Sequence, residues 1–331
     1  MEFASGRRRS GPRLDRGSRV RRLLLFLVAF GGCRAPALPE AQLFPAGTQL
    51  TARYLQVDGA RVRYIDAGRG PPVVFLHGLG ASMYAWRKNV GAVAAAGFRV
   101  IAFDNRGFGL SDKPSVPYDN AAYARLAIAL MDSLGISDAV LVGHSMGGAI
   151  AAEVAIEYPH RVRGLVLVGS AGLGAREPLL FRVARWPVLG PAVLALRGRG
   201  FTARLLKATY FDPSKVTQAD VDQYYAPVAQ PGYGRALRGV LQQFHFDGLD
   251  GRLDKIVAPT VVLWGEEDRW VPLRVGRALA AGITRSAFVS VPRAGHSVQE
   301  EAANDVNHLV IRFLRDGLPR VPQDLALALA R

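Results

Sequence analysis

The sequence predicts an α/β fold: a mostly parallel, eight-stranded sheet with helices on both faces and a helical lid inserted late in the sheet. Three observations support this prediction. Short apolar runs alternate with segments of helical length from about residue 52 onward. Some runs, such as 72–76 and 139–142, are apolar throughout, which is typical of strands covered on both faces. Residues 172–256 contain no convincing β run and form the predicted lid.

Composition sets the class of protein. The chain has 331 residues, of which 50% are hydrophobic and 21% charged. This length allows one large domain with an insertion, and this composition argues against wholesale disorder. The net charge is +15, but +7 of it lies in residues 1–34 and the rest is spread without a basic run. We therefore expect no nucleic-acid partner.

The N-terminal residues 1–34 resemble an export signal. A basic stretch ends at Arg21-Arg22, eight apolar residues follow, and Gly31-Gly32-Cys33 comes next. A membrane-spanning helix needs about 20 apolar residues, so this run is too short. We expect a signal peptide or a lipoprotein-type anchor at Cys33, and therefore an exported, periplasmic or membrane-anchored protein. The alternative is a frayed basic tail.

The remaining elements follow in order along the chain. Residues 35–50 are a Pro- and Ala-rich linker, and a hairpin is predicted at 54–65, where alternating runs flank Asp58-Gly59. Further strands are predicted at 72–76, 98–103, 139–142, 165–168, 260–264 and 287–291, and helices near 83–96, 120–135, 146–158, 273–282 and 300–316. The predicted core therefore spans 51–171 and 257–318, with the lid at 172–256 and a C-terminal tail at 319–331.

The strongest chemical motif is Gly143-His144-Ser145-Met146-Gly147, which lies between a predicted strand and a predicted helix. A serine on such a tight turn exposes its Oγ above the sheet, and the helix N-terminus favours developing negative charge. Small residues at 143 and 147 let the turn close. We therefore predict that Ser145 is a nucleophile; the alternative is a glycine-rich turn that serves packing only.

A nucleophilic serine needs a histidine base and an acid that orients the base. Among the histidines after Ser145, only His296 follows a strand end in a loop of small residues. His160, His245 and His308 lie at a helix end, in the lid and in the last helix. The acid should follow the preceding strand, where Glu266, Glu267 and Asp268 are the three candidates.

Two backbone N–H groups should bind the oxyanion. One is expected from Met146, directly after the nucleophile. The other is expected from the loop His77-Gly78-Leu79-Gly80, where Leu79 is the predicted donor. His77 lies before the serine and next to this loop, so we interpret it as structural.

With these motifs in this order, the sequence resembles the α/β-hydrolase superfamily, in particular its lid-bearing serine esterases and lipases. The resemblance covers about residues 55–316, and it implies that Asp268 is the acid of the triad and that 172–256 is the lid. The motifs that carry it are His77-Gly78-Leu79-Gly80, Asp104-Asn105-Arg106-Gly107-Phe108-Gly109, the turn at 143–148, the loop from Gly265 to Pro272, and Gly295-His296.

Single positions distinguish the branches of this superfamily. Epoxide hydrolases and haloalkane dehalogenases carry Asp where this chain has Ser145. Carbon–carbon bond hydrolases of aromatic degradation typically have Asn before the serine and Trp after the histidine, whereas this chain has His144 and Ser297. Cofactor-free haloperoxidases usually carry Phe before the serine. The His-Ser-Met-Gly-Gly form at 144–148 is most similar to monoacylglycerol lipases and related carboxylesterases.

The sequence therefore predicts hydrolysis of a carboxylic ester, with acylglycerols as one substrate class, through an acyl-enzyme on Ser145. No metal or organic cofactor is expected. One alternative keeps the triad but changes the bond to the carbon–carbon bond of a ring-cleavage product, a lactone or an amide. Another is a non-catalytic binding protein.

The predicted lid supplies candidate substrate contacts. An apolar stretch with interspersed arginines, Leu179 to Leu189, could bind acyl chains or associate with a membrane, or simply pack on the core. We predict Trp186, His144 and His245 as substrate-binding residues.

Overall fold

The computed structural model describes residues 50–174, 179–186, 189–195 and 197–318. The export signal with Cys33, the linker up to residue 49 and the tail at 319–331 lie outside the described residues, so export and lipidation stay predictions. Within the described part of the chain, no helix combines the length and the apolar character that crossing a bilayer requires.

The described residues form one eight-stranded sheet, in which the strands lie in the order β1-β2-β4-β3-β5-β6-β7-β8. The β1–β2 and β2–β4 pairs are antiparallel and the other pairs are parallel. The predicted eight-stranded, mostly parallel sheet is therefore confirmed. Its strands are β1 (Arg53–Val57), β2 (Ala60–Ala67), β3 (Pro72–Leu76), β4 (Arg99–Phe103), β5 (Ala139–His144), β6 (Val162–Val168), β7 (Thr260–Gly265) and β8 (Ser286–Val291).

Local chemistry explains several of these elements. Asp58 and Gly59 both have positive φ, +48° and +72°, as the tight turn between two twisted antiparallel strands requires. The long helix after β4 begins at Asn120 because the side chain of Asp119 accepts a hydrogen bond from the N–H of Ala122 at 2.7 Å.

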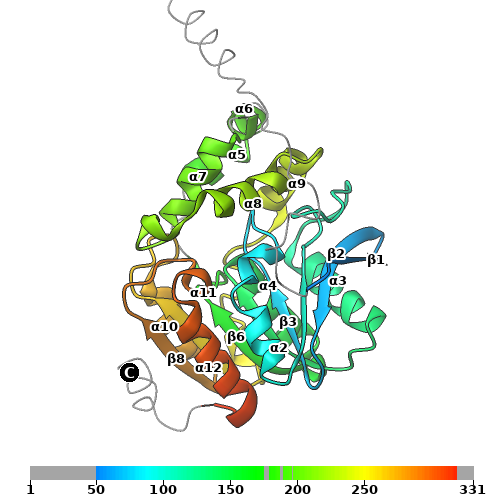
Figure 1. Cartoon of the computed structure of the whole chain (residues 1–331), viewed down its shortest axis with the longest axis vertical. Coiled ribbons are helices and arrows are strands. Elements are labelled where there is room, and N and C mark those ends of the chain that lie inside the picture. Colours follow the sequence, from blue (N-terminus) through cyan, green and yellow to red (C-terminus); the bar gives the residue numbers. More distant parts are fainter. Residues whose placement is uncertain (1–49, 175–178, 187–188, 196, 319–331) are drawn as a thin grey trace, which may run out of the picture. The chain divides into compact units, whose positions relative to one another are not determined.

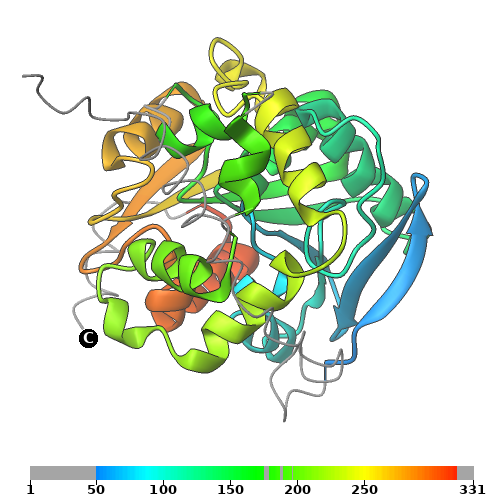
Figure 2. The ribbon, with the colours of Figure 1, turned by 90° about the horizontal axis from the view of Figure 1, so that it is seen from above.

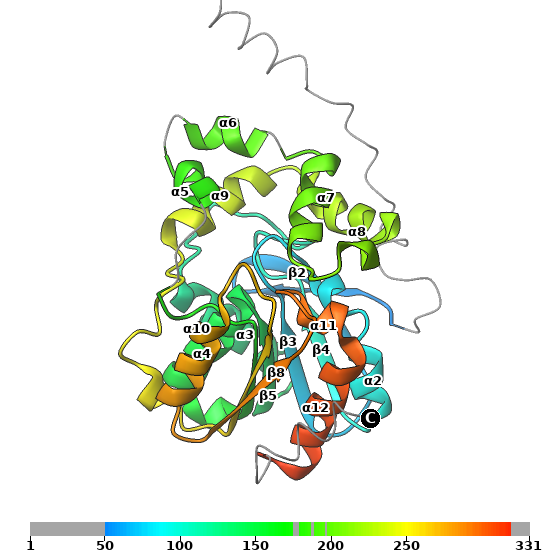
Figure 3. The same ribbon diagram turned by 90° about the vertical axis from the view of Figure 1, so that its left-hand side faces the viewer.

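Helices cover both faces of the sheet. In Figure 3, α3, α4 and α10 lie on one side of the strands, and α2, α11 and α12 lie on the other. On the second side, alternate apolar residues of the strands pack with residues of α2, α11 and α12 into one hydrophobic core cluster. The helices outside the lid, including two short 3-10 helices, are η2 (Met83–Trp86), α2 (Val90–Ala95), α3 (Asn120–Ser133), α4 (Met146–Glu157), η3 (Pro159–Arg161), α10 (Leu273–Gly282), α11 (Val298–Glu301) and α12 (Ala303–Asp316).

Two predicted helices are interrupted. The helix predicted near 83–96 is divided into η2 and α2, and the helix predicted near 300–316 is divided into α11 and α12. Asn89, at the first break, donates from Nδ2 to the Gln299 carbonyl at 3.1 Å and to Asn307 Oδ1 at 2.8 Å. The Asn89 side chain is therefore used in contacts with distant segments rather than to cap α2, and a short apolar pattern does not reveal such contacts.

The lid is helical and lies between β6 and β7 in the chain, as predicted. Figures 1 and 2 show its helices together beyond the carboxyl ends of the parallel strands, above the first residues of α4. They are α5 (Leu179–Ala184), α6 (Leu189–Ala195), α7 (Arg199–Ala208), η4 (Pro213–Lys215), α8 (Gln218–Val228) and α9 (Tyr233–Gln243). The last short helix of the insertion, η5 (Leu253–Lys255), instead packs against α10 next to the start of β7.

Candidate active site

Ser145 lies on a strained turn between β5 and α4. Its φ is +53° and its ψ is −117°, a conformation that costs a non-glycine residue on the order of 1–3 kcal/mol. Backbone hydrogen bonds hold the turn: the Ser145 N–H donates to the Val168 carbonyl at 3.0 Å, and the Ser145 carbonyl accepts from Gly148 at 3.0 Å and from Ala171 at 3.0 Å. The serine is thereby presented at the end of the sheet, and it lines a cavity.

The two small residues of the motif are needed because backbones approach closely here. A Cβ on Gly143 would lie 2.3 Å from the Gly147 carbonyl oxygen, and a Cβ on Gly147 would lie 2.2 Å from the Leu76 carbonyl oxygen. Both distances are far below van der Waals contact, and the atoms approached are backbone atoms that cannot swing away. The glycines therefore allow α4 to begin directly against β3.

Gly147→Ala should destabilise the protein. We expect the free energy of unfolding to fall by about 2 kcal/mol or more, because the added methyl group overpacks a rigid site. Urea denaturation followed by circular dichroism measures the change. Gly91→Ala is the matched control: Gly91 lies in α2 with open space around its Cβ position, so this variant should unfold at equal or higher urea concentration. Equal stability of the two variants would contradict the packing argument.

Asp268 and His296 form a buried pair. Asp268 follows β7, and its Oδ2 lies 2.7 Å from His296 Nδ1. Its other oxygen, Oδ1, accepts the N–H groups of Trp270 at 2.8 Å and Val271 at 2.9 Å. The carboxylate is thus fully engaged and accepts the Nδ1–H of the imidazole. This leaves Nε2 as the basic nitrogen of His296, which lines the same cavity as Ser145.

The other candidate residues for this pair lie elsewhere. Glu266 is exposed and accepts a hydrogen bond from Ser290 Oγ at 2.7 Å, and Glu267 is exposed as well. His160 and His308 are exposed on η3 and α12. Of the three acids that the sequence left open, the structure brings Asp268 to His296.

The predicted oxyanion donors lie beside Ser145. A Cβ on Gly78 would be 3.1 Å from Ser145 Cβ, so the loop after β3 passes directly against Ser145. Leu79 of this loop lines the cavity. Met146 is the first residue of α4, and its N–H therefore has no carbonyl partner within the helix.

His77 is bound on both ring nitrogens by the backbone. Its Nε2 accepts the N–H of Asn105 at 2.9 Å, and its Nδ1–H donates to the Gly78 carbonyl at 2.8 Å. Burial lowers its pKa, so the ring stays neutral. These contacts agree with the interpretation of His77 as a structural residue that holds the loop before Leu79.

His144 contacts the backbone of the predicted base. Its Nε2–H donates to the His296 carbonyl at 3.0 Å, and the two ring centroids are 4.8 Å apart. Burial lowers the pKa of His144 well below its ordinary value, and the nearby His296 acts in the same direction. His144 lines the cavity as predicted, but its Nε2 is already used to hold the loop of His296.

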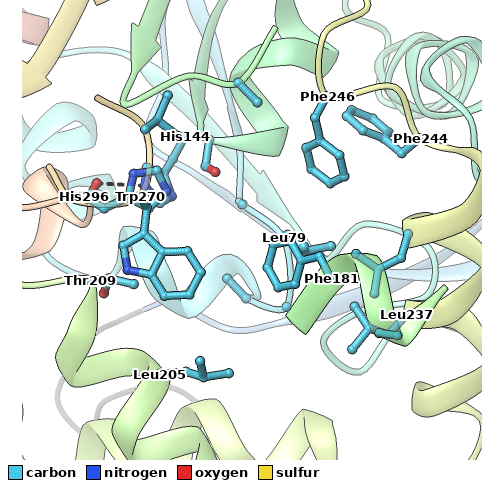
Figure 4. Close-up of a pocket in the computed structure, with 18 of the residues that line it drawn as sticks. Leu79, His144, Phe181, Leu205, Thr209, Leu237, Phe244, Phe246, Trp270 and His296 are labelled. Carbon is cyan, nitrogen blue, oxygen red and sulfur yellow. Dashed lines mark hydrogen bonds between the residues drawn. The ribbon is translucent and has the colours of Figure 1, made fainter. Parts of the chain in front are cut away.

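A mostly apolar cavity of about 580 Å³ lies between the lid and the end of the sheet. This volume is typical of small-molecule sites. Figure 4 shows His144, His296 and Trp270 on one side of it and Phe244 and Phe246 on the other. Two arginines, Arg185 and Arg197, are also among the lining residues. The aromatic lining residues are Phe181, Phe201, Tyr224, Tyr233, Phe244, Phe246 and Trp270.

The lid predictions have different outcomes. His245 lines the cavity, whereas Trp186 is 57% exposed and is not among the lining residues, so the prediction that Trp186 contacts substrate is not supported. Leu189 is also exposed. Membrane association of this surface stays a prediction.

Trp270 was missed by the sequence reasoning. Its indole stacks on His296 with ring centroids 6.4 Å apart and an interplanar angle of 25°, and it lines the cavity. Its position two residues after Asp268, in a loop already singled out, was the available signal.

Comparison with known proteins identifies relatives. A family model described as alpha/beta hydrolase fold matches residues 71–303. The chain is 35% identical over 273 residues to 2-hydroxy-6-oxo-6-phenylhexa-2,4-dienoate hydrolase of Burkholderia cepacia, covering 78% of this chain and 92% of that protein. It is 34% identical, with the same coverage of both chains, to a 2-hydroxy-6-oxononadienedioate/2-hydroxy-6-oxononatrienedioate hydrolase of Comamonas testosteroni.

A solved structure of a similar hydrolase agrees with these sequence relatives. The meta-cleavage product hydrolase of Pseudomonas fluorescens IP01 superposes with a TM-score of 0.70 and 28% identity, covering 80% of this chain and 98% of that chain. These relatives are not monoacylglycerol lipases, so the finer resemblance drawn from His-Ser-Met-Gly-Gly was wrong. The prediction of ester hydrolysis is contradicted with it, because the relatives are named for 2-hydroxy-6-oxo-dienoates. The match over residues 71–303 and the confirmed eight-stranded sheet establish that this chain is a hydrolase of the alpha/beta hydrolase fold family.

Proposed function

We propose that this protein hydrolyses the carbon–carbon bond next to the 6-oxo group of a 2-hydroxy-6-oxo-dienoate, the substrate class for which its relatives are named. The structural observation that carries the proposal is the cavity at Ser145 and His296. Its aromatic rings suit a flat, conjugated and mostly apolar molecule. Arg185 and Arg197, which also donate hydrogen bonds to the Leu241 and Leu194 carbonyls, add positive charge to the lining, and this charge favours the carboxylate of such a substrate.

The first half of the proposed reaction forms an acyl-enzyme. In the 2-oxo tautomer of the substrate, Ser145 Oγ bonds to C6 and its proton passes to His296 Nε2. The N–H groups of Leu79 and Met146 bind the oxyanion. The C5–C6 bond then breaks, its electron pair enters the conjugated 2-oxo system, and the imidazolium returns a proton to the leaving fragment.

The second half releases the acid. Water gives a proton to His296 as it attacks the acyl carbon, and the ester bond to Ser145 breaks with return of that proton to Oγ. The balance is one water consumed for one carbon–carbon bond broken, and Asp268 keeps the imidazole in the required tautomer through both halves.

One departure from the carbon–carbon hydrolase pattern has a structural counterpart. The pattern typically has Trp directly after the histidine, where this chain has Ser297. An indole nevertheless stacks beside the imidazole, with ring centroids 6.4 Å apart, because Trp270 reaches it from the loop of Asp268. The ring environment of His296 therefore does not argue against carbon–carbon cleavage.

A direct assay tests the proposal. Purified protein is mixed with 2-hydroxy-6-oxo-6-phenylhexa-2,4-dienoate, and we expect the visible absorbance of the dienoate to decay as benzoate appears in equal amounts by chromatography. A panel of p-nitrophenyl esters and a lactone serves as the control for bond type. Protein that reacts fully with a fluorophosphonate probe but leaves the dienoate intact would overturn the proposal.

A further inference from the structure

The end of α7 and the residues after it contact both loops that carry the Asp268–His296 pair. We call residues 208–212 the lid strap. On one side, Trp270, which lies two residues after Asp268 in the chain, donates from Nε1 to the Ala208 carbonyl at 3.0 Å. On the other side, Ser297 donates its N–H to the Thr209 carbonyl at 3.0 Å and its hydroxyl to Thr209 Oγ1 at 2.8 Å. The lid strap is therefore bound to the residue that follows the base.

The residue before the base is bound to the lid strap as well, through Glu301. Glu301 Oε2 accepts the N–H of Gly295 at 2.7 Å and the N–H of Phe211 at 2.9 Å, and its Oε1 accepts the N–H of Asp212 at 2.7 Å. The residue is 8% exposed. A carboxylate has only acceptors, so it can join three N–H donors of two segments that could not bond to one another.

The two segments are in close backbone contact at this point. A Cβ on Gly295 would lie 2.6 Å from the Thr209 carbonyl oxygen and 2.7 Å from the Phe211 nitrogen. The loop of His296 therefore rests on the lid strap without an intervening side chain. A displacement of the lid strap has to displace Gly295 and Ser297, and with them the imidazole between them.

We propose that Glu301 is a positioning residue, which sets the place of His296 by fastening Gly295 to the lid strap. The lid thus helps to position His296 in addition to covering the cavity. The proposal rests on the role of His296 as general base in the proposed reaction, but not on the identity of the substrate. Errors of about 1 Å in such placements cost on the order of 100-fold in rate.

The test replaces Glu301 in two ways. Glu301→Gln keeps the size of the side chain but turns one acceptor oxygen into an NH₂ group, which then faces an N–H donor. Glu301→Ala removes all three hydrogen bonds. We expect the rate of labelling by a fluorophosphonate, which requires Ser145 activated by His296, to fall about 10-fold in the first variant and about 100-fold in the second. In steady-state kinetics with a substrate that the protein hydrolyses, kcat should fall by similar factors at nearly unchanged KM.

Glu153→Gln is the matched control. Glu153 is also a buried glutamate that binds a residue of the 172–256 insertion, since its two oxygens accept from Arg252 at 2.8 and 3.1 Å, but neither residue lines the cavity. This variant should be less stable than the parent protein. Its labelling rate should equal that of the parent once each rate is divided by the folded fraction of the protein. Labelling of Glu301→Gln at the rate of Glu153→Gln would overturn the proposal.

A second variant acts from the lid side. Thr209→Val removes the hydroxyl that Ser297 binds and keeps the shape of the side chain, and it should slow labelling several-fold. If Glu301→Ala does not fold, Glu301→Gln and Thr209→Val decide the outcome. Because the probe reports the base directly, slowed labelling without dienoate turnover would leave this proposal standing and reject the proposed substrate.

Discussion

Replacing Ser145 by alanine should abolish turnover while leaving the fold and the substrate site intact. We expect kcat to fall by at least about 10⁴-fold, because the acyl-enzyme cannot form without Oγ and the remaining oxyanion donors supply only a residual acceleration. The strained turn gains no new contact from the change, so the thermal midpoint should change little. Stopped-flow decay of the dienoate measures the rate, and titration of its absorbance measures binding.

Ser133→Ala is the control for this experiment. Ser133 is an exposed serine on α3 whose hydroxyl donates to the Ala129 carbonyl at 2.7 Å, far from the cavity lining. Its variant should keep full activity. A Ser145→Ala protein within tenfold of the parent rate would exclude nucleophilic catalysis at this position, and so would fluorophosphonate labelling of that variant.

Replacing Asp268 by asparagine should cost about 10⁴-fold in kcat through the tautomer of His296. The two N–H donors of Trp270 and Val271 require a carbonyl oxygen at the position of Oδ1. The NH₂ group of the asparagine then occupies the position of Oδ2 and donates to His296 Nδ1. The imidazole must carry its proton on Nε2, where it can no longer accept the proton of Ser145.

Glu267→Gln makes the same acid-to-amide change one residue earlier, on an exposed side chain, and should leave kcat within twofold. A crystal structure of Asp268→Asn that keeps the 2.7 Å separation from the imidazole would separate the tautomer effect from a displaced loop. Equal activities of the Asp268 and Glu267 variants would remove Asp268 from the proposed mechanism.

Much of this fold follows from local sequence pattern. Strands such as β3 and β5 are short apolar runs between turn residues, and the hairpin turn at Asp58-Gly59 needs positive φ at both positions. The turn at Ser145 was recognisable for the same reason, because at positions 143 and 147 the backbones approach so closely that only glycine fits. Ser145, Asp268 and His296 could be named because chain order and strand ends assign them positions at one edge of a parallel sheet.

The chemical bond was not predictable in this way. The ester prediction relied on His144 and on Ser297, two side chains adjacent to the nucleophile and the base in sequence. In the fold, His144 uses its Nε2 to hold the His296 loop, and Ser297 faces the lid at Thr209. Both residues line the cavity, but each also has a structural role in the loop of His296, so their residue types are a weak guide to the bond that is cleaved.

The sequence by itself determined the sheet, the lid insertion and a serine held on a strained turn, because each depends on residues close together in the chain. The tertiary structure decided which of three neighbouring acids meets His296, that Trp270 stacks beside that imidazole and that Trp186 is not among the lining residues of the cavity. It also decided that Glu301 joins the lid strap to the loop of His296. These features depend on contacts between segments up to about 90 residues apart, and pattern within a short window carries no information on such contacts.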